Sequence, residues 1–305
     1  MENKIIFLRP YISSRIWGGK KLLDYNYDCP YEKNGEAWIT SAIPEKSSYL
    51  LNRGLESTTL LEFFNQNKEF FNFYSKPYPL LTKIIDANDD LSIQVHPNDE
   101  YALKKHNSYG KAECWYVFEC EPNASLIYGH NASNFDELKN YVDHHEWRKL
   151  LIETKVNVGD VIYVPPGTIH AIKKNMLIFE LQQSSDITYR LYDYDRKDLN
   201  GEKRELHLED SLNVIYYPQN NLKIVSKKEA SGLLINSEFF KLEKIINHSK
   251  QKYIFLKAQW IQATVISGSG FINDQPLQKG TTFLVAHKYE FELSGNLELL
   301  VSYIE

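Results

Sequence analysis

Three short segments of the chain carry residue types that bind divalent metal ions. In the first, LSIQVHPN, one residue separates Gln94 from His96. The alternation of Ile93 and Val95 with polar residues predicts a strand that carries Gln94 and His96 on one face. Such a pair can reach one metal ion, although a hydrogen-bonded interior pair is the commoner outcome. The pair alone therefore indicates a metal site only weakly.

The second and third segments supply further donors. KAECWYVF predicts a strand on which Glu113 points the same way as Trp115. In VNVGDVIYVPPGTIHAI we expect Gly159 to form a hairpin turn and Pro-Pro-Gly to reverse the chain, which delivers His170 inwards. Imidazole and carboxylate groups suit zinc, and a glutamine supplies a carbonyl oxygen. Two nitrogen and two oxygen donors leave room for water or substrate, as a catalytic site requires.

These motifs occur together and in order. The spacing of Gly159, Pro165, Gly167 and His170 is the second motif of the cupin superfamily. With QVHP at 94–97, KAE at 111–113 and Asp186-x-x-x-Arg190, the chain resembles type I mannose-6-phosphate isomerases, most closely the short form of Bacillus-like bacteria. RIWGG at 15–19 and EAW at 36–38 extend the resemblance over at least residues 8–210.

The resemblance implies a zinc-dependent interconversion of mannose 6-phosphate and fructose 6-phosphate, with one zinc ion per chain. It implies the zinc ligands Gln94, His96, Glu113 and His170. Arg190 resembles the family's active-site arginine. Two positions depart from the larger members of the family. Gly110 stands where those members have a histidine, and Ile172 where they have an aromatic residue, so no histidine is carried over for ring opening.

The chemistry requires a base, stabilisation of charge on oxygen and an anchor for the phosphate. Arg190 is permanently cationic and suits an oxyanion or a phosphate, and the resemblance suggests Ser92 as a second phosphate contact. Lys111, Glu180 and Asp186 are the candidates for proton movement. Two structural alternatives stay open: Glu180 as a buried strand residue without a catalytic role, and Asp186 as a simple ion-pair partner of Arg190.

The fold expected is mainly β, because Tyr, Phe and Trp are abundant and favour pleated sheets. We expect two cupin (jelly-roll) β-barrel domains with a few inserted α-helices. Residues 1–235 would form the catalytic domain and residues 236–305 a smaller one without metal ligands. An internal repeat supports this division, since Gly159 aligns with Gly280 and His170 with Phe291. The second copy thus keeps the turn but loses the ligand.

Local patterns predict helices over residues 57–71, 98–106 and 133–153 and around 206–215. From residue 239 onwards we expect short alternating strands with turns at SGSG, NDQP and LSGN.

Composition excludes several functional classes. A net charge of −5 with dispersed basic residues argues against nucleic acid, and no apolar run approaches the length of a membrane span. The N-terminal segment lacks a signal core, and three cysteines without CxxC spacing are expected to be reduced thiols. We therefore expect a cytoplasmic monomer or weak homodimer that binds a sugar phosphate.

Two rival functions remain at this stage. One is an iron-dependent cupin oxygenase, because iron sites commonly use two histidines and a carboxylate. The other is a non-catalytic sugar-binding paralogue, because a fold does not fix a function.

Overall fold

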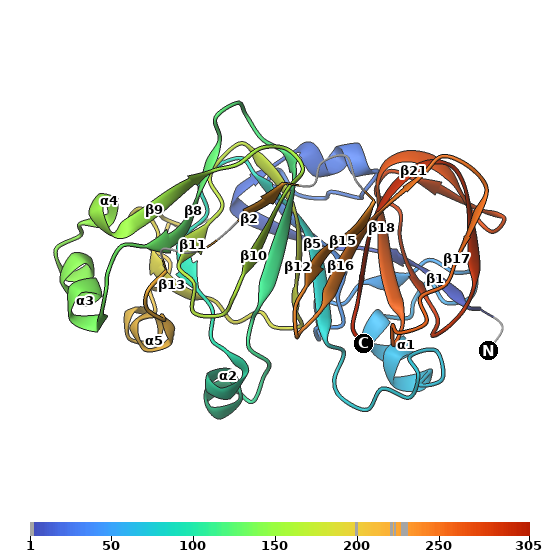
Figure 1. The fold of residues 1–305 in the computed structure, drawn as a ribbon, viewed down its shortest axis with the longest axis horizontal. Helices are drawn as coiled ribbons and strands as arrows, with labels where there is room; N and C mark the ends of the chain where they lie inside the picture. Colours follow the sequence, from blue (N-terminus) through green and yellow to red (C-terminus); the bar gives the residue numbers. More distant parts are fainter. Residues whose placement is uncertain (1–2, 199–200, 220–221, 223, 227–230) are drawn as a thin grey trace.

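Three antiparallel sheets make up most of the computed structural model, which describes residues 3–198, 201–219, 222, 224–226 and 231–305 (Figure 1). The seven-stranded sheet consists, in spatial order, of β14 (Ile224–Ser226), β10 (Asp160–Val164), β7 (Glu113–Glu119), β12 (Met176–Gln183), β5 (Leu80–Ala87), β2 (Tyr11–Gly19) and β3 (Asn34–Thr40). The five-stranded sheet consists of β13 (Tyr189–Tyr192), β6 (Ile93–Val95), β11 (His170–Ala171), β8 (Ser125–His130) and β9 (Leu151–Lys155).

The nine-stranded sheet consists of β15 (Gly232–Asn236), β16 (Lys241–Asn247), β21 (Phe291–Tyr303), β18 (Ile261–Ile272), β20 (Thr282–Val285), β1 (Ile5–Arg9) and β4 (Tyr49–Leu50), with β17 (Gln251–Tyr253) beside β21 and β19 (Gln275–Gln278) beside β18. The helices are η1 (Lys21–Tyr25), α1 (Leu60–Gln66), α2 (Asp99–His106), α3 (Phe135–Asp143), α4 (Trp147–Leu150) and α5 (Leu208–Val214). None of these helices is long and apolar enough to cross a membrane.

The seven-stranded sheet lies between the other two and is buried on both faces (Figure 1). On β5, Ile84 packs with residues of the nine-stranded sheet such as Leu284. Its neighbour Ile85 points the other way and packs with Tyr128 of the five-stranded sheet. Side chains of a strand alternate between faces, so a strand buried on both faces is apolar nearly throughout. The predicted mainly β fold of two cupin-type barrels with a few helices is confirmed.

The nine-stranded sheet contains strands from both ends of the chain. In it β1 pairs with β20, so that Ile6 lies opposite Leu284. The sheet also includes β15, which starts at Gly232. The division of the chain into domains at residue 235 stays a prediction, and the first strand of the chain lies with the C-terminal strands (Figure 1).

The predicted internal repeat has the same backbone geometry in both copies. Gly159 and Gly280 have φ values of 89° and 90°, a conformation that favours glycine. The amide of Gly159 donates to the carbonyl of Val117 over 2.9 Å, and that of Gly280 donates to Val265 over the same distance. Each glycine therefore anchors its turn to the neighbouring strand in the same way.

Two predicted helices are longer than the structure shows. The helix expected over 57–71 is α1, which ends at Gln66 because its C-cap Asn67 leaves helical backbone angles (φ −121°, ψ 54°). The helix expected over 133–153 is broken at His145 (φ 54°), and residues from Leu151 onwards pair with β8 as strand β9. Tertiary pairing overrides the helical pattern there. The helices expected over 98–106 and around 206–215 are confirmed as α2 and α5.

Two of the three predicted C-terminal turns are wrong. SGSG lies within β18 and LSGN within β21, and these long strands pair with each other, with Gly270 opposite Gly295. Gly268 and Gly295 have positive φ, so the glycines accommodate an irregular stretch of paired strand rather than a reversal of the chain. The third turn is confirmed at Asn273 between β18 and β19.

Candidate metal centre and active site

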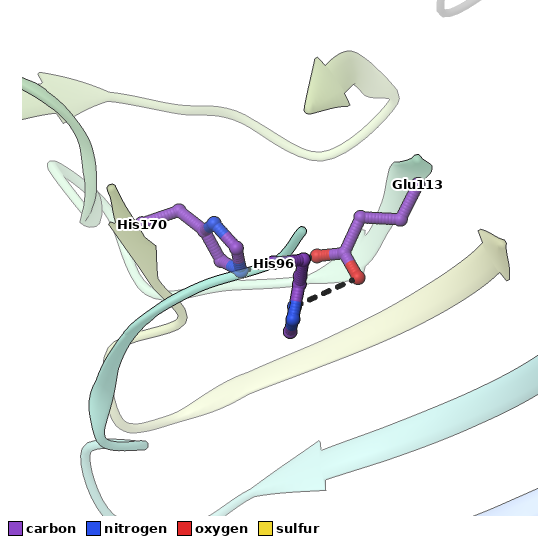
Figure 2. Close-up of side chains that lie close together, drawn as sticks. All are labelled: His96, Glu113 and His170. Atoms are coloured by element: carbon purple, nitrogen blue, oxygen red, sulfur yellow. Dashed lines mark ion pairs between the residues drawn. The ribbon is translucent and has the colours of Figure 1, made fainter. Parts of the chain in front are cut away.

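Three predicted ligands from separate segments converge between the five-stranded and seven-stranded sheets. His96 follows β6, Glu113 begins β7 and His170 begins β11. Their ligand atoms lie within 4.8 Å of one another, and Figure 2 shows the three side chains pointing toward a common point. Gln94 lies opposite His170 in the sheet, with its Nε2 3.3 Å from His170 Nε2. The strand is shorter than expected, since β6 ends at Val95 and His96 lies just beyond it.

Backbone carbonyls fix the tautomer of both histidines. His96 Nδ1 lies 3.0 Å from the carbonyl of Ile187, and His170 Nδ1 lies 2.8 Å from that of Thr168. A carbonyl only accepts hydrogen bonds, so Nδ1 carries the proton and Nε2 presents a lone pair. Hydrogen bonds of this kind hold metal-binding histidines in the required orientation.

Each Nε2 lone pair faces the Glu113 carboxylate, with one donor beside it: Lys111 Nζ lies 3.1 Å from His96 Nε2, and Gln94 Nε2 lies 3.3 Å from His170 Nε2. His96 Nε2 is 3.4 Å from Glu113 Oε2, and His170 Nε2 is 3.3 Å from Oε1 (Figure 2). All three residues are buried, and neither Glu113 oxygen accepts a well-formed hydrogen bond from the described residues. Three acceptors that face one another in a buried site are stabilised by positive charge; the Lys111 ammonium supplies part of it, and the convergence of the three ligand atoms suits a metal ion. Two imidazoles, a carboxylate and an amide suit zinc, so the site fits this ion.

Burial and a lysine set the charges in this cluster. Burial, with the nearby Lys111 ammonium, lowers the pKa of His96 to about 3, and burial also lowers that of His170. Burial alone would raise the pKa of Glu113, but Lys111 and His96 hold it well below its ordinary value. Lys111 Nζ lies 2.9 Å from Glu113 Oε2 and 3.1 Å from His96 Nε2. Neutral histidines beside an ionised carboxylate are the protonation states that bind a metal.

The buried centre borders a cavity of about 490 Å³, a size that accommodates a small ligand. Gln94 and Lys111 face both the cavity and the cluster. The cavity is lined by Ser14, Arg15, Ile16, Trp17, Glu36, Lys83, Ile85, Leu91, Ser92, Gln94, Lys111, Ile172, Glu180, Asp186, Thr188, Arg190, Asp198 and Arg204. The lining therefore includes all five residues predicted to act on the sugar or its phosphate.

The two predicted acids have different surroundings. Glu180 is buried, ion-paired with Lys83 over 3.0 Å and hydrogen-bonded by Trp115 Nε1 at 3.2 Å. Burial raises the pKa of Glu180, although Lys83 opposes the shift. Asp186 is more exposed and pairs with Lys46, so the alternative in which it only pairs with Arg190 is wrong. Both carboxylates face the cavity.

Arg190 is placed by its own strand and by the segment before α5. Its Nη1 donates to the carbonyl of Glu205 over 2.8 Å, whereas its buried Nε has no hydrogen-bond partner among the described residues. Burial lowers the pKa of Arg190, and the charge of Arg204 adds to this effect. Ser92, the second predicted phosphate contact, is buried at the cavity wall.

The glycine that departs from the larger family members has no room for a side chain. A Cβ on Gly110 would lie 2.5 Å from the backbone carbon of Asn98 and 2.6 Å from the nitrogen of Asp99. Its amide also donates to Asp99 Oδ1 over 2.7 Å. A histidine therefore does not fit at this position without a shift of the backbone.

Several charged cavity residues were missed by the sequence analysis. Lys83 is the one basic residue in β5, where every position is buried, and a lysine in a strand that otherwise reads as buried was the available signal. Glu36 lies within the EAW segment but was given no role. Arg15 begins the RIWGG segment but was likewise given no role, and Arg204 carries no local signal in the sequence.

Comparison with known proteins identifies relatives along the whole chain. Phosphomannose isomerase type I, catalytic domain, matches residues 5–121. The chain is 40% identical to mannose-6-phosphate isomerase ManA of Bacillus subtilis (strain 168) over 100% of both chains. The crystal structure of the mannose 6-phosphate isomerase from Bacillus subtilis superposes with a TM-score of 0.91 at 36% identity, covering 99% of this chain and 100% of that chain. A mannose 6-phosphate isomerase bound with zinc and yttrium shares the fold, with a TM-score of 0.74 at 16% identity over 99% of this chain and 100% of that chain.

Proposed function

The chain belongs to the type I phosphomannose isomerase family, and we propose that the buried centre beside the cavity is its zinc site. The activity is the zinc-dependent interconversion of D-mannose 6-phosphate and D-fructose 6-phosphate. The proposed ligands are Gln94, His96, Glu113 and His170. One observation carries this assignment: the ligand atoms of two histidines and a buried carboxylate from separate segments converge within 4.8 Å of one another.

The isomerisation moves a proton between C1 and C2 of the open-chain sugar. A bound zinc ion supplies Lewis-acid polarisation of the sugar oxygens. Lys111, whose ammonium group borders both the cavity and the cluster, donates to a sugar oxygen and stabilises negative charge as it develops there. Ser92 and Arg190 bind the phosphate, because a serine hydroxyl and a guanidinium both donate to phosphate oxygens.

A carboxylate carries the proton between C1 and C2 of the sugar. Glu180 and Asp186 both face the cavity and can accept and return a proton. Burial raises the pKa of Glu180 toward the range in which a base is effective, whereas the more exposed Asp186 is held by Lys46. We assign the two carboxylates, with Lys111, to the proton-transfer machinery of the site.

A coupled assay tests the function. We expect the full chain to convert mannose 6-phosphate to fructose 6-phosphate, to lose this activity to a chelator, and to recover it with zinc. Glu180→Gln and Asp186→Asn then separate the two acids: the variant that loses the base no longer exchanges the sugar C2 hydrogen with deuterated solvent. No turnover by folded, zinc-loaded protein would contradict the proposal.

Location and assembly are further proposals. We infer a cytoplasmic protein, and the support is that Cys29, Cys114 and Cys120 are all free thiols, as a reducing compartment keeps them. The expectation of a monomer or weak homodimer stays a prediction, which sedimentation of the zinc-loaded protein would measure.

A further inference from the structure

Three arginines from separate segments line the cavity. Arg190 comes from β13, Arg15 from β2, and Arg204 from the chain that leads into α5. The proposed function uses Arg190 alone. Guanidinium groups repel one another, so a cavity that gathers three of them is organised for an anion.

A buried carboxylate holds Arg204 in place. Arg204 Nε donates to Asp193 Oδ2 over 2.7 Å, and its Nη2 donates to the other oxygen of the same group. The chain beside it is tied to β13, since His207 N donates to the carbonyl of Arg190 over 2.8 Å. Asp193 is only 4% exposed and is shared with Arg196. One carboxylate thus serves two guanidinium groups, of which Arg204 alone lines the cavity.

Arg15 has a similar support on the opposite strand of the barrel wall. Its Nη2 donates to Glu36 Oε2 over 2.8 Å, and the same oxygen accepts from Trp38 Nε1 at 2.9 Å. Burial would raise the pKa of Glu36, but Arg15 and Lys83 lower it to about 2, so Glu36 stays ionised. The Arg15 guanidinium is held by this contact and by a hydrogen bond to the carbonyl of Ser14. A guanidinium has five N–H donors, so further donors remain for a ligand.

Arg190 completes the group and has the fewest partners. It forms no ion pair with any carboxylate of the described residues, and its Nε is buried without a hydrogen bond. A dianionic phosphate would accept hydrogen bonds from donors of Arg190 that face the cavity and offset the positive charge of the neighbouring guanidinium groups. Planar guanidinium groups match phosphate oxygens in geometry as well as in charge.

We propose that Arg15 and Arg204 bind the substrate phosphate together with Arg190, and that this arginine site makes the cavity selective for a phosphorylated over a free sugar. The inference rests on the proposed function, which it deepens by assigning the specificity of the site. Arg204 is positioned by Asp193 and Arg15 by Glu36, so both guanidinium groups are in place before the phosphate arrives.

The experiment compares Arg15→Gln and Arg204→Gln with the wild-type protein, all zinc-loaded. We expect KM for mannose 6-phosphate to rise roughly tenfold to a hundredfold in each variant, with kcat changed less than about threefold. Competitive inhibition by inorganic phosphate should weaken by a similar factor. Arg196→Gln is the matched control, because Arg196 shares Asp193 but does not line the cavity; its KM should stay within about threefold of the wild-type value.

Unchanged KM and phosphate inhibition in Arg15→Gln and Arg204→Gln, beside an active wild-type protein, would overturn the arginine site while leaving the proposed function intact. An equal rise of KM in Arg196→Gln would overturn the arginine site too, since the effect would then come from the disturbed ion pairs of Asp193 and not from a lost phosphate contact. If the glutamine variants unfold, Arg15→Lys and Arg204→Lys replace them. A lysine keeps the positive charge but lacks the paired N–H donors of a guanidinium group, so calorimetry with inorganic phosphate must show weaker binding. Calorimetry on the wild-type protein also separates the two ideas, because an inactive wild-type protein that binds phosphate contradicts the proposed function alone.

Discussion

The two β-barrels of the chain share a turn and differ in what they bury. Around the turn at Gly159, the first barrel encloses two histidines and an ionised glutamate. Around the equivalent turn at Gly280, the interior is an apolar cluster that includes Phe283 and Leu299. Because the backbone hydrogen bonds of the two turns match, the difference lies in the side chains alone.

Strand register identifies which residues replace the ligands. Glu113 lies opposite Val164, and in the second barrel Ile261 lies opposite Val285 at the matching place. Phe291 begins its strand as His170 begins β11. An isoleucine and a phenylalanine thus occupy the positions of a carboxylate and an imidazole. The barrel tolerates buried polar ligands only where a metal compensates them, and otherwise apolar packing fills the same space.

The largest effect should follow from removing the carboxylate ligand. Glu113→Gln keeps the shape but removes the charge that binds zinc, so we expect zinc content below about one-tenth per chain and activity lower by roughly a thousandfold or more. Metal analysis and the coupled assay measure both. The matched control is Ile261→Val at the equivalent position, which should leave zinc content and kcat unchanged. Full zinc occupancy in folded Glu113→Gln would contradict the ligand assignment.

Removal of the aromatic residue at the histidine-equivalent position should affect stability and not catalysis. Phe291 is buried and stacks on Tyr253 with ring centroids 5.8 Å apart. Phe291→Ala leaves a cavity, and we expect unfolding to become easier by about 3–5 kcal/mol. Urea denaturation measures the loss, while kcat of the remaining folded protein should match the wild-type value. A large fall in kcat at unchanged stability would show that the second barrel takes part in catalysis.

The repeat and the ligand motifs could be predicted from the sequence because they depend on local spacing. A glycine with positive φ, an apolar strand and a Pro-Pro-Gly turn leave a pattern in sequence, and so does the alternation around Gln94. The turn at Gly159 and the convergence of His170 with Glu113 follow from such patterns. The pairing of β1 with the C-terminal strands could not be predicted, because nothing near Ile6 encodes a partner almost 280 residues away.

The errors at β9 and in the C-terminal turns share one physical cause, which is that distant packing overrode local preference. Leu151 onwards fits a helical pattern but pairs with β8, and Gly270 in SGSG pairs with Gly295 in LSGN rather than forming a turn. Arg204 reached the cavity through its contact with Asp193, eleven residues away in the sequence. Ligands fixed by strand register are therefore easier to predict than charges delivered by loops.

The two interiors should also respond differently to acid. Burial keeps His96 and His170 neutral in the folded protein, with pKa values below the ordinary value. Unfolded histidines bind protons below about pH 6.5, so the folded state loses stability as the pH falls from 7 to 5, by roughly 2 kcal/mol for His96. Urea denaturation of zinc-free protein at both pH values measures this. His96→Gln should flatten the dependence, whereas replacing the exposed His144 with glutamine should not; equal slopes in both variants would rule out the buried ring as the source.

The shared turn offers the smallest and most local comparison. Gly159 and Gly280 have nearly the same positive φ, so an alanine at either position carries a backbone strain of about 1–2 kcal/mol. At Gly280 the added Cβ would also lie 2.3 Å from the carbonyl oxygen of Tyr25. We therefore expect Gly280→Ala to destabilise the protein by roughly 1 kcal/mol more than Gly54→Ala, where φ is 82° and no heavy atom lies within 4 Å of the added Cβ, as measured by urea denaturation of the zinc-free forms. Equal costs would mean that η1, which carries Tyr25, moves away freely, and that the second barrel is held less tightly against the N-terminal segment than its contacts indicate.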